Sequence, residues 1–189
     1  MKRYVLPLIG FFMMGCGDDP LPKPKAYLRL EYPNPHYEKT NIPLPFSFEK
    51  NKITEPINSI KSSTSSNGID VKYPALKATI YLTYKKVEND NLDNLLRDAQ
   101  NLTQKHTIKA DEISSDFFEN TEERVYGMFY QIGGDAASQS QFYVTDSINH
   151  FVSGSLYFYA KPNYDSIYPA SEYLKNDIKR IMETIRWEE

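Results

Sequence analysis

The segment that ends at Cys16 constrains this chain more than any other feature. Two basic residues follow the initial methionine, an apolar run of eleven residues covers positions 4–14, and Gly15 precedes Cys16. This order is typical of a secretory signal sequence. The apolar run is too short to span a membrane, because a helix needs about 20 apolar residues to cross the hydrocarbon core. We therefore expect residues 1–15 to be removed as a signal peptide.

Cys16 stands where bacterial lipoproteins carry their acylated cysteine. In the lipobox of those proteins a Leu-like residue, a small residue and Gly or Ala precede the cysteine, and here Met13, Met14 and Gly15 hold these positions. Cleavage before Cys16 would leave its thiol and amine free to carry two or three acyl chains, such as palmitate, which anchor a protein stably. The alternative is a buried thiol in a first helix. The basic start and the length of the apolar run favour lipidation at Cys16 and a membrane anchor.

Cys16 is also the only cysteine of the 189 residues. Once it is acylated, the mature chain can form neither a disulfide nor a cysteine zinc site, and its stability has to come from packing. Loss of the signal peptide changes the formal net charge from −3 to −5, since Lys2 and Arg3 leave with no acidic residue. An acidic chain lacks the basic excess that binding to nucleic acid needs, so we expect no nucleic-acid partner.

Proline spacing divides the mature chain into two parts. Prolines recur through residues 20–45, and a stretch with so many prolines is extended rather than helical. We expect residues 16–45 to form a tether that holds the protein off the membrane. The remaining residues, 46–189, have the length of one globular domain and are rich in tyrosine and phenylalanine, which suit β-strands.

Two periodicities alternate along the domain. Alternation of apolar and polar side chains predicts strands over residues 46–49, 69–73, 77–85, 125–132, 141–145 and 151–159. A spacing of three and four predicts amphipathic helices over residues 91–106 and 169–187. The connections between strands are short, which requires antiparallel pairing. The predicted fold class is α+β, a mainly antiparallel sheet with helices packed on one or both faces, and the element order is similar to that of the Mog1/PsbP-type sandwich.

Three further segments carry specific expectations. Both faces of residues 125–132 are largely apolar, which predicts a central strand covered on both sides. Residues 111–123 contain six acidic residues, and a solvated run is favoured there over a Ca²⁺ site, which would need a tighter loop. Gly133 and Gly134 fit a hairpin turn better than a phosphate-binding loop, because the P-loop lysine is missing and a strand follows.

The three histidines are the candidates for catalysis, because no cysteine nucleophile remains in the mature chain. None lies in a catalytic or metal-binding motif, although His106 and Asp111 could pair as a base and its orienting acid. We expect His106 to pack on its helix, His150 to cap a strand beside a turn and His36 to be solvated. The sequence thus indicates no catalytic residue, no cofactor and no metal. A periplasmic small-ligand pocket or hydrolase site built from tyrosines and one histidine is the alternative.

Long segments of the chain are similar to one protein family. They are LPKPKAYLRLEYP at 21–33, LPFSFEKN at 44–51, YPALKATIYLTYK at 73–85, NLLRDAQNLTQKHTIKADEI at 94–113, the stretch at 125–169 and DIKRIMETIRW at 177–187. Together with Cys16, they resemble the GldD-type gliding-motility lipoproteins of the Bacteroidetes. The resemblance implies a non-enzymatic component of the cell envelope that is needed for gliding and for the linked type IX secretion apparatus, with proteins of those machineries as partners. We expect it to be lipid-anchored and to face the periplasm.

Two tripeptides suggest a modification. Asp146-Ser147-Ile148 and Asp165-Ser166-Ile167 resemble the Asp-Ser/Thr-aliphatic O-glycosylation acceptor of exported Bacteroidetes proteins. Both lie where turns are expected, and loops expose their side chains. Ser147 and Ser166 are therefore candidate acceptors. The alternative is ordinary turn chemistry, in which Asp and Ser bond the local backbone and Ser166 helps to open the terminal helix.

Overall fold

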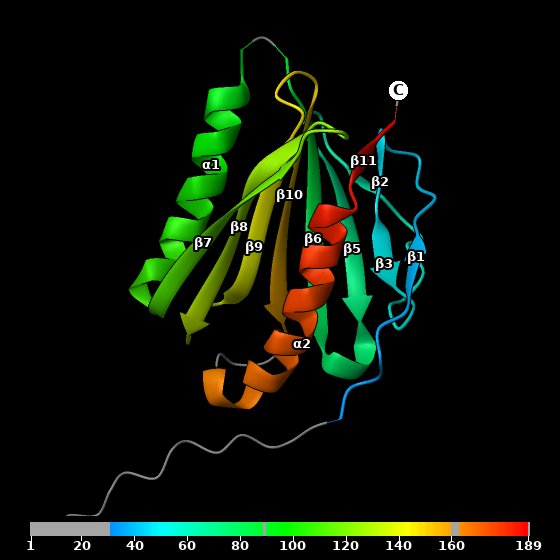
Figure 1. Ribbon diagram of the computed structural model, residues 1–189. Helices are drawn as coiled ribbons and strands as arrows, with labels where there is room; N and C mark the ends of the chain where they lie inside the picture. Colours follow the sequence, from blue (N-terminus) through cyan, green and yellow to red (C-terminus); the bar gives the residue numbers. More distant parts are fainter. Residues whose placement is uncertain (1–30, 89, 160–162, 189) are drawn as a thin grey trace, which may run out of the picture.

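The computed structural model describes residues 31–88, 90–159 and 163–188, so the signal peptide and Cys16 lie outside the described residues. The centre of the fold is a seven-stranded antiparallel sheet (Figure 1). In spatial order its strands are β4 (Lys61–Ser62), β5 (Asn67–Tyr73), β6 (Ala78–Lys86), β10 (His150–Phe158), β9 (Ser138–Thr145), β8 (Val125–Gly134) and β7 (Ala110–Asn120).

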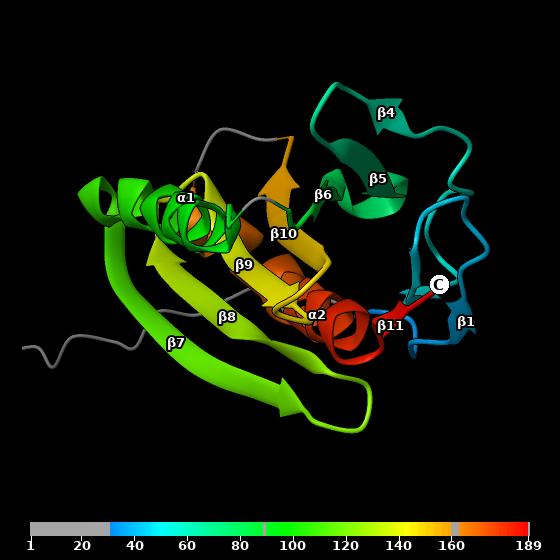
Figure 2. The same cartoon turned by 90° about the horizontal axis from the view of Figure 1, so that it is seen from above.

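Two helices cover opposite faces of this sheet. Helix α1 (Leu92–Gln104), which the 3-10 turn η2 (Lys105–Ile108) extends, lies on one face, and α2 (Tyr164–Glu183) lies on the other (Figures 1 and 2). The 3-10 turn η1 (Pro74–Leu76) joins β5 to β6. Two ribbons complete the α2 side: β1 (Tyr37–Lys39) with β3 (Glu49–Asn51), and β2 (Phe46–Ser47) with β11 (Arg186–Trp187). The predicted α+β class with a mainly antiparallel sheet is confirmed.

The main core lies between the sheet and α2. Leu174, Ile178 and Ile181 form the apolar stripe of α2, and all three side chains are fully buried. They belong to one cluster with the inward-facing residues of the sheet, such as Ile80 and Leu82 of β6. These alternate along the strand because successive side chains point to opposite faces. The terminal helix therefore supplies much of the packing in a fold whose described residues contain no cysteine.

The strand covered on both sides is β9, and the prediction that residues 125–132 form this strand is wrong. β8 is second from the edge of the sheet, and Tyr126, Met128 and Tyr130 on its α1 side are only half-buried. Every residue of β9 is buried, because α1 packs over one of its faces and α2 over the other. Apolar side chains on both faces of a strand thus do not by themselves decide its place in the sheet.

The acidic segment before β8 is a strand. β7 pairs with β8 along the edge of the sheet, where Ile113 and Phe118 are half-buried and the carboxylates are exposed. The expectation of a solvated acidic run is correct for the side chains and wrong for the backbone. Charged residues are a common protection of edge strands, since they discourage pairing with another chain. The alternation of apolar residues that marks an inner strand is weak in such a segment.

Helix α2 begins five residues earlier than its proline suggested. The sequence predicts that Pro169 lies in the first turn, whereas the structure places it inside a helix that starts at Tyr164. The N–H of Tyr164 donates to the carboxylate of Asp135 at 2.8 Å, so a residue of the β8–β9 turn satisfies a free N–H group at the start of the helix. A contact distant in sequence therefore sets where α2 begins.

Part of the segment expected to be a tether packs on the domain. Ile42 is buried, and the Tyr37 hydroxyl donates to the Asp177 carboxylate of α2 at 2.7 Å. The side-chain amide of Asn51 donates to the same carboxylate at 3.0 Å. Burial raises the pKa of Asp177, although both hydrogen bonds act in the opposite direction. A buried carboxylate thus holds residues of the segment 31–45 against the terminal helix.

Candidate functional site

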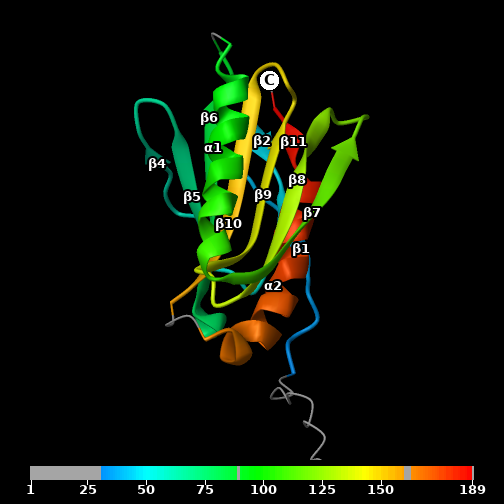
Figure 3. The same ribbon diagram turned by 90° about the vertical axis from the view of Figure 1, so that its left-hand side faces the viewer.

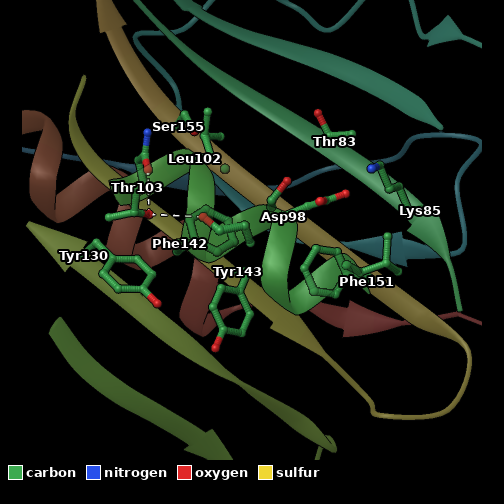
Figure 4. A pocket seen from close by; sticks show the side chains of 15 residues that line it. Thr83, Lys85, Asp98, Leu102, Thr103, Tyr130, Phe142, Tyr143, Phe151 and Ser155 are labelled. Atoms are coloured by element: carbon green, nitrogen blue, oxygen red, sulfur yellow. Dashed lines mark hydrogen bonds between the residues drawn. The ribbon is translucent and has the colours of Figure 1, made fainter. Parts of the chain in front are cut away.

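Helix α1 covers only part of its face of the sheet. Leu95, Leu96 and Ala99 pack with Tyr143 of β9 and Phe151 of β10. The helix runs along the strands, with the β4–β5 hairpin beyond it (Figure 3), and seen from above a strip of β6 and β10 lies between the two (Figure 2). A cavity of about 200 Å³ opens there between α1 and the sheet (Figure 4).

The floor beside this cavity is a polar face of β6 and β10. Cross-strand neighbours on this face are Thr79 with Tyr157, Tyr81 with Ser155, and Thr83 with Ser153. All six point away from the α2 core, because they alternate with core residues along their strands. A second hollow of about 410 Å³ lies against the β4–β5 loop and shares Lys85 and Leu95 with the first. We call this floor, with α1 on one side and the β4–β5 hairpin on the other, the trough.

Three tyrosines gather at one end of the trough. The rings of Tyr81 and Tyr157 meet edge to face with their centroids 5.8 Å apart, and Tyr159 is 60% exposed. The Tyr159 hydroxyl lies 2.5 Å from Oγ1 of Thr79 and 3.3 Å from the hydroxyl of Tyr81. The hydrogen bond with Tyr159, together with burial, raises the pKa of Tyr81 to about 12. The Tyr81 hydroxyl is therefore neutral at physiological pH.

Charges around the trough are of both signs. Nζ of Lys61 on β4 lies 2.6 Å from Oδ2 of Asp70 on β5, and 5.9 Å from the centre of the Tyr81 ring. Lys85 on β6 and Asp98 on α1 both line the cavity. Lys86 and Glu88 line the second hollow, and Lys72 on β5 lies near Tyr159. Acidic groups thus lie beside most of the basic ones, and the site has no strong excess of one charge.

His106 lies at the end of α1 beside a buried amide. Its Nε2 is 3.0 Å from the amide nitrogen of Gln141, and the Thr103 hydroxyl donates to the carbonyl oxygen of the same amide at 2.9 Å. Burial lowers the pKa of His106, which favours the neutral ring. In the described part of the chain no hydrogen bond joins His106 to Asp111. The imidazole of His106 therefore lacks the carboxylate that would orient it if His106 and Asp111 acted as a catalytic pair.

The other two histidines lie elsewhere. His150 begins β10, where its Nδ1 is 3.0 Å from the Tyr84 hydroxyl and its ring stacks on Trp187 with the centroids 5.1 Å apart. Burial lowers the pKa of His150, and this outweighs the nearby negative charge of Asp146. His36 is exposed, before β1. The structure does not bring the three histidines together, and the ring nitrogens of His106 and His150 that form hydrogen bonds do so with neutral groups.

Both candidate acceptor serines are exposed. Ser147 lies in the β9–β10 loop in the left-handed region, with φ 67°. The Asp146 carboxylate accepts the N–H groups of Ile148, Asn149 and His150 at 2.8–2.9 Å. Burial alone would raise the pKa of Asp146, but these hydrogen bonds lower it overall. Ser166 lies in the first turn of α2. Asp146 thus performs the turn chemistry expected for its tripeptide and leaves Ser147 at the surface.

The sequence pattern contained one signal for the trough. Thr79, Tyr81 and Thr83 form the polar side of the predicted strand over 77–85, which indicates a face without a packed helix. The sequence pattern does not show which strand lies beside these three residues or how far α1 extends over them. Both depend on pairing between segments that are far apart in the chain. The hydroxyls of Ser153 and Ser155 join the site only through the register of β10 on β6.

Two further properties concern the described residues alone. Within 31–88, 90–159 and 163–188, no group of three or more His, Cys, Asp or Glu side chains is placed to hold a metal ion. No helix in these ranges is both long and apolar enough to cross a membrane.

Comparison with known protein families identifies the family of this chain. A family model described as gliding motility lipoprotein GldD matches residues 17–187. Neither the curated proteins nor the solved structures contain a significant match, so the similarity to the Mog1/PsbP-type sandwich stays a prediction from element order.

Proposed function

We propose, since this chain belongs to the family of gliding motility lipoproteins GldD, that it is a non-enzymatic module that binds partner proteins in the gliding machinery and in the linked type IX secretion apparatus. The family match over residues 17–187 carries this proposal. The geometry of the histidines supports it, because a triad-type site needs an imidazole that a carboxylate orients through a hydrogen bond. His106 contacts Gln141 and His150 contacts Tyr84 instead.

The anchor is the second part of the proposal. Residues 1–15 act as the signal peptide, Cys16 carries the fatty acids, and the domain faces the periplasm. The family match to a lipoprotein supports an anchor. The described chain lies against the domain from its first residues on, since Tyr32 stacks on Tyr173 with the ring centroids 4.8 Å apart and the Tyr173 hydroxyl donates to the carbonyl of Pro33. The fifteen residues from Cys16 to residue 30 could reach at most about 50 Å. This length lets the domain contact partners at some distance from the membrane.

Replacement of Cys16 by alanine tests the anchor and its role. In the native host, Cys16→Ala is expected to abolish incorporation of labelled palmitate and to leave the precursor uncleaved, because lipoprotein signal peptidase acts after the thioether has formed. Colony spreading and secretion through the type IX apparatus are expected to be lost with it. Fatty-acid labelling, the apparent mass on a gel and the two cell assays measure these outcomes.

Met13→Leu is the matched control for this experiment. It changes the same signal segment, brings it closer to the lipobox and leaves the cysteine in place, so labelling and spreading are expected to persist. Palmitate incorporation by the Cys16→Ala protein would contradict the anchor. Normal spreading and secretion by cells whose protein is neither lipidated nor cleaved would contradict the need for the anchor in gliding.

O-glycosylation of Ser147 and Ser166 belongs to the same proposal. Both serines are exposed in the structure, as an acceptor must be. The mass of the protein purified from its native host is expected to exceed the mass of the lipidated chain by that of one or more glycans. The double variant Ser147→Ala, Ser166→Ala is expected to lack this excess mass. Intact mass spectrometry decides the matter. A wild-type mass equal to that of the lipidated chain would exclude the modification.

A further inference from the structure

We propose that the trough beside α1 binds a neutral glycan chain, with the sugar rings stacked on the tyrosine cluster and the sugar hydroxyls bound by the serine and threonine side chains of the floor. This inference goes beyond the assembly role and does not depend on it. It rests on the shape of the trough, on the chemistry of its floor and on its charge.

The shape favours a segment of a polymer. The cavity at α1 holds about 200 Å³, less than the roughly 300–1,000 Å³ of pockets that enclose a drug-sized ligand. It is continued by the hollow of about 410 Å³ at the β4–β5 loop. Thr79 is buried beneath Tyr159, so the floor open to a ligand extends from Tyr81 to Lys85, four residues along β6 or about 13 Å. An extended ligand that lies along the strands would use this whole length.

The floor offers hydroxyl groups that no other side chain uses. Among the described residues, the hydroxyls of Thr83, Ser153 and Ser155 form no hydrogen bond with the protein, and all three residues line the cavity. A hydroxyl is both a donor and an acceptor. Sugar hydroxyls have the same dual character, so a row of such side chains can bind either orientation of each. A floor for a carboxylate or a phosphate would instead present several guanidinium or ammonium groups, whereas Lys85 is the one basic residue among the described residues that line this cavity.

The tyrosine cluster supplies the surface for the apolar side of a sugar. The C–H groups on the flat side of a hexose pack on aromatic rings, and a tyrosine combines such a ring with a polar tip. Tyr159 is 60% exposed, and Tyr81 lies directly across from Ser155, which lines the cavity. The cluster therefore places stacking surfaces next to hydroxyl partners, as a chain that alternates flat apolar faces and polar edges requires.

Charge and topology favour a glycan over the other extended polymers. Lys61 is paired with Asp70 and Lys86 with Glu88, Lys85 and Asp98 both line the cavity, and Lys72 lies near Tyr159. With acidic groups beside most of the basic ones, neither a nucleic acid nor a strongly basic peptide finds a surface of complementary charge. A peptide that binds by strand addition needs a free sheet edge. The floor strands β6 and β10 are both interior strands, paired on both sides. Their backbone groups are occupied, and side chains are left to make the contacts.

Titration of the lipoprotein with soluble glycans tests the proposal. The probes are the β-1,4-linked hexamers of N-acetylglucosamine and of glucose, added to the detergent-solubilised protein in a calorimeter. At least one of them is expected to bind with a Kd of about 1 mM or tighter. Tyr157→Ala and Tyr159→Ala are each expected to weaken binding about tenfold, through loss of a stacking surface. Tyr159 is exposed enough for its removal to leave the fold intact, and a thermal melt verifies this.

Tyr126→Ala is the matched control. Tyr126 lies on β8, two strands away from the floor, so its removal is expected to leave binding unchanged. Failure of both hexamers to bind at millimolar concentration overturns the proposal. Equal weakening by Tyr126→Ala overturns the assignment to the trough, and binding of a neutral six-residue peptide in place of the glycans overturns the ligand class. None of these results changes the gliding assays on Cys16→Ala, so failure here is distinguishable from failure of the proposed function.

Discussion

Shortening Ile178 or Ile181 to alanine is expected to cost about 2–5 kcal/mol of the free energy of unfolding for each substitution. Both side chains are fully buried between α2 and the sheet, and truncation there loses transfer free energy and leaves a cavity. Urea unfolding measures the loss, with the single tryptophan, Trp187, as the fluorescent probe.

Ile108→Ala is the control for these two variants. Ile108 is 87% exposed at the end of η2, so the same change of side chain is expected to alter stability by no more than about 0.5 kcal/mol. The loss of stability at Ile178 and Ile181 would then result from their burial and not from a general difference in stability between isoleucine and alanine. Unfolding midpoints of all three variants close to that of the unmodified protein would place α2 outside the core.

Gly127→Ala is expected to destabilise the protein by about 3 kcal/mol, which is the upper part of the usual range for overpacking. A Cβ at this position of β8 would lie 1.9 Å from the carbonyl oxygen of Tyr143 and 2.9 Å from Cα of Val144. Both are backbone atoms of the neighbouring strand β9, so they cannot move aside without disturbing the β8–β9 ladder. The same urea titration measures the effect.

Gly68→Ala provides the comparison within the same sheet. Gly68 also lies in a strand, β5, but the nearest atom to a Cβ there would be Cβ of Lys61 at 3.6 Å, an ordinary contact. Its replacement is expected to change stability by less than about 1 kcal/mol, because the site accepts a Cβ and alanine restricts the unfolded chain. Equal losses of stability in the two variants would show that the close approach of β9 is not what requires glycine at position 127.

Local periodicity predicted most of the elements. The strand over 77–85 appears as β6 and the helix over 91–106 as α1 with η2. The expected hairpin of 141–145 with 151–159 is β9 paired with β10. Each of these segments has either one apolar and one polar side or apolar residues throughout. This pattern can be seen in the segment's own sequence, without knowledge of its partners in the fold. The antiparallel pairing followed because the connecting loops are too short for a crossover.

The errors occur where a distant partner decides the outcome. β7 has few apolar residues because an edge strand needs only one neighbour, so its sequence does not differ from a solvated acidic run. α2 starts at Tyr164 because Asp135 caps it from another loop. β9 takes the doubly covered position because both helices pack over it.

The sequence by itself determined the α+β class and membership of the lipoprotein family, because amphipathic periods and long matching segments are properties of the linear chain. Lipidation at Cys16 is likewise a prediction from local sequence. Only the tertiary structure decided the order of strands, the burial of Asp177 against Tyr37 and the trough beside α1. These features require residues far apart in the chain to meet. The physical reason is that a side chain carries its polarity and size locally, whereas its burial and its partners come from the packing of the whole domain.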